Sequence, residues 1–310
     1  MNFLGLDVGG THCRYEWWPT GSRAGGHARP VQPAVHGIEA TADGLFAALA
    51  AACRGVEPSA AVLALAGAGD AGTSAAIGAG LRARGITFPV AVVGDVLAAA
   101  AAALRDGPGV LLWAGTGSFA VARRNDGGLE RVGGRGYLLG DQGSGYDVVR
   151  RAAAAVLLAQ DGLGPATALT EALTNHFAAP SPLRLGAALQ QLDPGSVAAA
   201  LPRVLDVVAA GDPVANEVLA GAVDALAMLA AAAVRKAELD WAALPVALGG
   251  GVLLGAGAVT ALVSQRLAAL GAVPPQLVEA RAAARGAAWL AHGWHTRLEP
   301  QRTWVDRVAL

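Results

Sequence analysis

Hydrophobic and polar positions in the first third of the chain follow two alternating patterns. Short runs of consecutive apolar residues predict buried strands, and longer stretches with apolar residues three or four positions apart predict helices. The predicted strands are 3–8, 14–18, 61–65 and 90–93, and the predicted helices are 41–54, 73–84 and 97–104. The first helix is expected to start at a cap, Thr41, and to bury Leu45, Phe46, Leu49 and Cys53. Strands that alternate with helices predict an α/β fold.

The same pattern restarts after Pro108. Further strands are predicted at 110–113, 119–124, 129–132 and 245–248, and long helices at 213–236 and 282–295. A chain of 310 residues is long for a single core. We therefore expect two domains, residues 1–112 and 113–310, with the terminal helix able to pack back on the first.

Each half opens with an apolar strand that breaks into a turn of Gly and Thr. The first turn is Gly9–His12, and the second is Gly115–Ser118. Glycine lets backbone N–H groups approach an anion without a Cβ in the way. One such turn is equally compatible with a plain hairpin, but the pair favours two phosphate-binding loops. Asp7, just before the first turn, could hold Mg²⁺ or water beside phosphates, or could cap local N–H groups.

Three further motifs could carry chemistry. Asp95 follows a strand rich in Val and precedes a helix, so it could be a base at a sheet edge or a helix N-cap. Asp141 is the carboxylate within the Gly-rich stretch 133–146, where it could accept two hydroxyl hydrogen bonds from a sugar. A flexible linker is the alternative, but Leu138, Leu139 and Tyr146 favour a ligand loop. Gly249–Gly251 could let adenosine lie against the backbone or could be a tight turn.

Composition and charge exclude several classes. The formal net charge is −1, without the clustered Lys and Arg of a nucleic-acid or anionic-membrane surface. Asp7 interrupts the first apolar run too early for a secretory signal, so we expect a cytoplasmic protein. The uncharged stretch 242–265 contains Pro245 and several Gly, which predict a strand, a loop and a helix rather than a membrane span. His292 and His295 have no third ligand and are expected to pack.

Taken in order, these motifs resemble those of the N-acetylglucosamine kinases in the BadF/BadG/BcrA/BcrD ATPase group, over about residues 2–292. The resemblance implies an α/β fold of two ribonuclease H-like (actin-like ATPase) domains. Each would be a mixed β-sheet with flanking helices, and the two would close over ATP and sugar in an interdomain cleft. The implied partners are a sugar and ATP with Mg²⁺, and relatives of this kind are commonly homodimers. No nucleic acid or membrane partner is expected.

The resemblance also implies roles for individual residues. Asp95 matches the catalytic base, and Asp7 matches the acidic position associated with Mg²⁺. The nucleotide-binding positions are Gly9, Gly10, Thr11, His12, Gly115, Thr116, Gly117, Ser118, Gly249, Gly250 and Gly251. The sugar-binding positions are Gln32, Arg135, Gly136, Tyr137, Gly140 and Asp141.

Three positions depart from the family pattern. Arg135 stands where many relatives carry Trp, Gln142 where Glu is usual, and Gln32 where Asn commonly reaches the sugar. The implied reaction is transfer of the γ-phosphoryl of ATP to the 6-hydroxyl of N-acetylglucosamine. Glucosamine or another hexosamine is the nearest alternative substrate. Alternatives of another class are an ATPase activator of a 2-hydroxyacyl-CoA dehydratase, which would need cluster-binding cysteines, and a sugar sensor without turnover.

Overall fold

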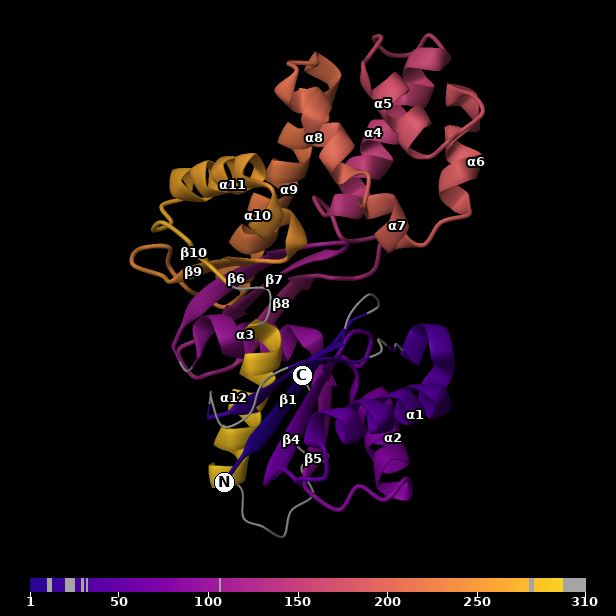
Figure 1. Cartoon of the computed structure of the whole chain (residues 1–310). Helices are drawn as coiled ribbons and strands as arrows, with labels where there is room; N and C mark the ends of the chain where they lie inside the picture. Colours follow the sequence, from indigo (N-terminus) through magenta and orange to yellow (C-terminus); the bar gives the residue numbers. More distant parts are fainter. Residues whose placement is uncertain are drawn as a thin grey trace. The chain divides into compact units, whose positions relative to one another are not determined.

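The computed structural model describes residues 1–9, 13–19, 26–28, 31, 33–105, 107–278 and 282–297 (Figure 1). The chain forms two compact units, one made of Met1–Gly107 with Glu279–Leu310 and the other of Pro108–Val278. The boundary expected after residue 112 would fall inside strand β6 (Gly109–Ala114), whereas the units divide before that strand. Helix α12 (Ala282–Arg297) belongs to the first unit.

The first unit is built on a five-stranded sheet in the order β3-β2-β1-β4-β5. Its strands are β1 (Phe3–Val8), β2 (Cys13–Trp18), β3 (Gly26–Ala28), β4 (Ala60–Leu65) and β5 (Val90–Gly94). Strands β2 and β3 run antiparallel to their neighbours, and β1, β4 and β5 are parallel. Val8, Leu65 and Gly94 form one row across the parallel strands. The carboxyl ends of these three strands therefore meet at one edge of the sheet.

Helices cover both faces of this sheet. Helices α1 (Pro33–Cys53) and α2 (Ala71–Ala83) pack on one face, where Leu4, Leu6 and Val8 join their core. Helices α3 (Asp95–Leu104) and α12 pack against each other and against β1 and β4, with α12 beside β1 in Figure 1. A Cβ on Gly5 would lie 2.1 Å from the Ala288 nitrogen, so the bare glycine permits this close packing of helix on strand.

The first helix differs from its prediction at two positions. Thr41 does not cap it: α1 begins at Pro33, its backbone is non-helical at Gly37, and the Thr41 hydroxyl donates to the Gly37 carbonyl at 2.7 Å. Leu45 is buried as expected, but Phe46 is 36% exposed. Adjacent helical residues point about 100° apart, so Phe46 falls off the buried face.

The second unit repeats the topology of the first. Its sheet has the order β10-β9-β6-β7-β8, with β6 antiparallel to β7, β7 antiparallel to β8, and β6, β9 and β10 parallel. The strands after β6 are β7 (Ser118–Arg123), β8 (Leu129–Gly133), β9 (Val246–Gly249) and β10 (Gln276–Leu277). Strands β6 to β10 thus correspond in order and direction to β1 to β5. The predicted α/β fold with two related halves is confirmed.

Helices fill the long segment between β8 and β9 and follow β9. They are α4 (Gly145–Gln160), α5 (Leu169–His176), η1 (Pro182–Arg184), α6 (Leu185–Gln190), α7 (Pro194–Ala198), α8 (Leu201–Ala209), α9 (Pro213–Lys236), α10 (Gly251–Gly255) and α11 (Gly257–Ala269). Helix α9 is long and apolar enough to cross a membrane, by length and composition alone. It packs against β6, β7, β8 and α4, which gives its apolar residues a place in the core of this unit. The stretch 242–265 holds β9, α10 and part of α11, as predicted.

Candidate functional site

Two carboxylates lie at the carboxyl edge of the first sheet. Asp7 is on β1 and is buried, and Asp95 directly follows β5 and is partly buried. The N-cap of α3 is Gly94, and Asp95 is the first helical residue, where its Oδ1 accepts the Val96 N–H at 3.0 Å. The interpretation of Asp95 as the N-cap is therefore wrong. The parallel strands bring the ends of β1 and β5 to the same edge, which could not be read from sequence distance.

The first Gly turn is only partly described. Gly9 directly follows β1. Gly10, Thr11, His12 and Gln32 lie outside the described residues, so their roles remain predictions.

Motifs that are far apart in the sequence converge in the second unit. The second Gly turn closes with the Gly115 N–H donating to the Gly117 carbonyl at 2.8 Å. The Gly115 carbonyl accepts the Gly145 N–H at 2.8 Å, and a Cβ on Gly117 would lie 2.7 Å from Oδ2 of Asp141. A Cβ on Gly115 would lie 3.6 Å from the Gly251 nitrogen. The turn thus touches both the Gly-rich segment around Asp141 and the start of α10.

The two hydroxyl residues of this turn are placed differently. Thr116 is exposed. Ser118 is 1% exposed, and its Oγ donates to the Gln142 carbonyl at 2.7 Å. Its own carbonyl accepts the Gly134 N–H at 2.8 Å. Ser118 therefore joins the turn to the segment that carries Asp141.

Asp141 is buried and has a positive φ of 56°. Burial raises the pKa of its carboxyl, while the N–H groups of Ser118 and Gly136 and the charge of Arg131 act in the opposite direction. Asp is among the few residues that tolerate this backbone region. The carboxylate is thus held in place at the Gly turn.

Asp147 is a buried carboxylate that the sequence analysis did not identify. It accepts the Gly143 N–H at 2.9 Å and forms ion pairs of 2.8 Å with Arg150 and Arg151. Burial acts to raise the pKa of Asp147, but the Gly143 N–H and the two guanidiniums outweigh it and lower the pKa. The available signal was Ser144 followed three residues later by an acid, a pattern typical of a capped helix start. The Ser144 hydroxyl indeed caps α4 by accepting the Asp147 N–H at 3.2 Å.

Four other predicted sugar-binding residues lie on the turn before Asp141: Arg135, Gly136, Tyr137 and Gly140. Arg135 and Gly136 are exposed, and the Gly140 N–H donates to the Gly136 carbonyl at 2.8 Å. The ring of Tyr137 meets that of Tyr146 edge-on, with centroids 5.0 Å apart. The apolar pair between these glycines also points to solvent, since Leu138 and Leu139 are 79% and 91% exposed.

Packing accounts for two glycines of the 249–251 run. A Cβ on Gly249 would lie 2.5 Å from the Trp113 ring, and one on Gly250, where φ is 92°, would lie 2.3 Å from the Ala114 carbonyl oxygen. Gly251 begins α10, and a Cβ there would meet no atom within 4 Å. The tight-turn interpretation therefore explains Gly249 and Gly250, and Gly251 has open space beside it.

Two other features do not join the predicted site. His292 and His295 pack against Phe3, with ring centroids 5.1 and 5.4 Å away, and no cluster of three His, Cys, Asp or Glu suited to a metal occurs in the described part of the chain.

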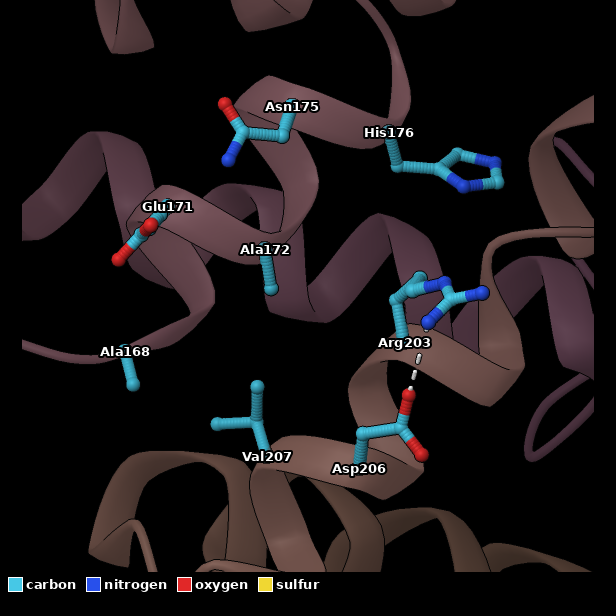
Figure 2. A pocket seen from close by; sticks show the side chains of 8 residues that line it. All are labelled: Ala168, Glu171, Ala172, Asn175, His176, Arg203, Asp206 and Val207. Carbon is cyan, nitrogen blue, oxygen red and sulfur yellow. Dashed lines mark hydrogen bonds and ion pairs between the residues drawn. The ribbon is translucent and has the colours of Figure 1, made fainter.

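A hollow of about 550 Å³ lies between α5 and α8. Figure 2 shows that it is lined by residues of these helices, including an Arg203–Asp206 ion pair of 3.2 Å, and none of the predicted site residues lines it.

The fold defines the class of the protein. Two sheets of one topology, each with flanking helices, make the fold of the actin-like and hexokinase-like ATPases. Within that class the chain belongs to the BadF/BadG/BcrA/BcrD ATPase family, which it matches over residues 4–291.

Several known proteins are similar to this chain in sequence or in fold. The chain is 36% identical over 89 residues to an N-acetylmuramic acid/N-acetylglucosamine kinase of Clostridium acetobutylicum, a match that covers 29% of each. It is 44% identical over 70 residues to the glucosamine kinase GspK of Vibrio cholerae, covering 22% of this chain and 23% of that protein. These matches thus span less than a third of each relative. A solved structure of a candidate N-acetylglucosamine kinase from Chromobacterium violaceum shares the fold, with a TM-score of 0.74, 24% identity, and coverage of 94% of this chain and 98% of that one.

Proposed function

We propose that the protein is an ATP-dependent amino-sugar kinase. It transfers the γ-phosphoryl of ATP to the 6-hydroxyl of N-acetylglucosamine, and the products are N-acetylglucosamine 6-phosphate and ADP. The observation that carries the proposal is the contact between Gly117 and Asp141, where a Cβ would lie 2.7 Å from the carboxylate. A turn suited to phosphates and a carboxylate suited to sugar hydroxyls are thus neighbours. Family membership and the kinase names of the relatives support the same reaction.

Asp95 is proposed as the general base. It accepts the proton of the sugar hydroxyl, whose oxygen forms the new bond to the γ-phosphorus while the bond to the bridging oxygen of ADP breaks. Phosphoryl transfer depends chiefly on positioning and charge stabilisation. The exposed Thr116 is proposed to contribute to phosphate binding with its hydroxyl and with the N–H groups of its turn.

Mg²⁺ fits the residues at the edge of the first sheet. Asp7, at the end of β1, would supply a hard oxygen ligand there, directly or through water. Mg²⁺ bound with nucleotide typically uses one or two carboxylates together with phosphates and water, so no larger ligand cluster is required. When bound, the ion would neutralise charge on the triphosphate.

An ADP-release assay with N-acetylglucosamine, glucosamine, N-acetylmannosamine and glucose tests the proposal. We expect the highest kcat/KM with N-acetylglucosamine. A much higher value with glucosamine would select the glucosamine kinase alternative, which the Vibrio cholerae relative favours. Sugar binding without any sugar-dependent ADP release would overturn the kinase proposal in favour of a sensor.

The variant Asp95→Asn tests the assignment of the base. We expect kcat to fall by roughly 10²-fold or more while ADP affinity stays near that of the wild type, because the amide cannot accept the proton. Asp70→Asn is the matched control, since Asp70 is the N-cap of α2 and Asn caps a helix equally well. Near-normal turnover of Asp95→Asn would exclude Asp95 as the base.

The dehydratase-activator alternative requires thiolate ligands for an iron–sulfur cluster. Cys13 is 1% exposed, and burial, together with the negative charge of Asp7, raises its pKa to about 11 despite a backbone hydrogen bond involving Ala28. Its thiolate is therefore strongly disfavoured at neutral pH. Cys53 is half-buried on α1. We expect colourless protein after anaerobic purification, and a brown protein with bound iron and sulfide would select this alternative.

A further inference from the structure

The hydroxyl of Ser118 forms a hydrogen bond within the protein. Its Oγ donates to the Gln142 carbonyl at 2.7 Å, and the residue is 1% exposed. Thr116, on the same turn, is exposed. A phosphate arriving from solvent can therefore reach the Thr116 hydroxyl, whereas the Ser118 hydroxyl would first have to leave a partly buried acceptor.

The acceptor of this hydrogen bond is next to the proposed sugar-binding carboxylate. Gln142 directly follows Asp141, whose carbonyl accepts the Ser144 N–H at 3.1 Å. The Gly143 N–H donates to the Asp147 carboxylate at 2.9 Å, and the Gly145 N–H to the Gly115 carbonyl at 2.8 Å. The segment is thus closed on itself and tied to the Gly turn at both ends. Displacing the Gln142 carbonyl must therefore shift Asp141.

There is little room for such a shift. A Cβ on Gly117 would already lie 2.7 Å from Oδ2 of Asp141, so the carboxylate rests against the backbone of the turn. A positioned carboxylate recognises a hydroxyl pair only when its two oxygens stay within about 0.5 Å of the productive geometry. The Ser118 N–H holds the Asp141 carboxylate directly, and the Ser118 hydroxyl, through the Gln142 carbonyl, holds the backbone that carries Asp141.

We infer that Ser118 is a positioning residue for Asp141, and that it acts on sugar affinity rather than as a ligand of the phosphates. This inference rests on the proposed function, because it takes Asp141 as the sugar-binding carboxylate. It replaces the phosphate-binding role that the family resemblance implies for Ser118, and it leaves that role to Thr116.

Three variants test the inference. Ser118→Ala removes the donor, and Ser118→Cys keeps a side chain of similar shape with only a weak donor. Both are expected to raise the KM for the sugar roughly 5- to 30-fold, the factor expected when a partly buried carbonyl loses its partner, with ADP affinity within about 2-fold of the wild type. Thr116→Ala, the matched control on the same turn, is expected to weaken ADP binding and to leave the KM for the sugar unchanged. ADP affinity is measured directly by calorimetry.

Hydrogen exchange gives a readout that does not depend on turnover. Amides of the segment 141–147 are expected to exchange faster in Ser118→Ala than in the wild type or Thr116→Ala, because the segment has lost its link to the turn. Weakened ADP binding in both Ser118 variants, with unchanged sugar KM and unchanged exchange, would overturn the inference. If no sugar supports ADP release by the wild-type protein, the proposed function fails. The role of Ser118 can still be tested if the proposed function fails. Unaltered hydrogen exchange together with weakened ADP binding in the Ser118 variants would then refute that role.

Discussion

Asp147 offers a direct test of how the segment around Asp141 is held. The variant Asp147→Ala removes the acceptor of the Gly143 N–H and the partner of two guanidiniums, those of Arg150 and Arg151. It also removes a negative charge from the first turn of α4. Gly143 is buried, so its N–H would be left without a partner.

The expected loss can be worked out from these contacts. A hydrogen bond to a charged acceptor contributes about 1.5–3 kcal/mol, and a negative charge at a helix N-terminus adds about 0.3–1 kcal/mol. The guanidinium side chains are 51% and 35% exposed, so each ion pair adds only about 0–1 kcal/mol. One charge serves all these interactions and they overlap. We therefore expect the free energy of unfolding of the second unit to fall by about 2–4 kcal/mol, which lowers its Tm by roughly 5–15 °C.

The pH dependence of the stability shows whether the charge of Asp147 stabilises the fold. The folded-state pKa of Asp147 is lowered below its unfolded value of about 3.9, so the ionised carboxylate stabilises the fold above that pH. This contribution is lost as the pH falls through the folded-state pKa. Asp147→Asn, which keeps an acceptor oxygen but no charge, should therefore be less stable than the wild type at pH 7. The difference should shrink below about pH 4.

Scanning calorimetry at several pH values measures these differences. Asp224→Ala is the control, because its ion pair with Arg266 is half-exposed on both sides and should contribute less than about 1 kcal/mol. Equal Tm values for Asp147→Ala and Asp224→Ala at pH 7 would refute the reasoning. So would an Asn variant whose deficit is as large at pH 3 as at pH 7.

Two further predictions concern Asp141 and Gly5. Burial raises the folded-state pKa of Asp141, so its ionised form opposes folding at neutral pH and stability rises as the pH falls through that pKa. Asp141→Asn should therefore stabilise the protein at pH 7 by about 0.5–2 kcal/mol while raising the sugar KM, and a lower Tm would contradict this. Gly5→Ala would place its Cβ 2.1 Å from the Ala288 nitrogen and should cost about 1–3 kcal/mol or more. Gly257→Ala, where a Cβ meets nothing within 4 Å, should leave the Tm within about 2 °C of the wild type, and equal effects of the two substitutions would refute the packing argument.

Elements whose apolar pattern is continuous were predictable from the sequence. The strands β1 and β6 and the helix α9 occur where the pattern places them, because a buried strand or helix needs an unbroken apolar run or stripe. The start of α1 was not predictable, since Thr41 is a good cap in isolation and only the structure shows that helical residues begin at Pro33, before a kink at Gly37. Phe46 was misplaced because an aromatic residue beside a buried leucine need not share its face.

The residues of the candidate site were likewise only partly predictable from the sequence. The Gly turns and Asp141 could be selected as candidates, since each needs a specific residue type at one position, and their roles stay predictions. Asp147 and the inward hydroxyl of Ser118 could not, because their roles depend on which backbone groups lie opposite them in space. The sequence left Asp95 open between a base and a cap; the helix start excludes only the cap, since Gly94 holds that position, and the role of base stays a prediction.

By itself, the sequence determined the α/β pattern, its duplication and the four Gly-rich motifs, because hydrophobic period and glycine placement are local properties of the chain. Only the tertiary structure decided which motifs meet. The antiparallel pair of β6 and β7 makes the second turn, and the parallel strand β9 delivers Gly251 beside it. The segment before α4 then returns Asp141 to the same turn. The physical reason is that strand pairing and buried hydrogen bonds join residues by their position in the sheet, whatever their separation along the chain.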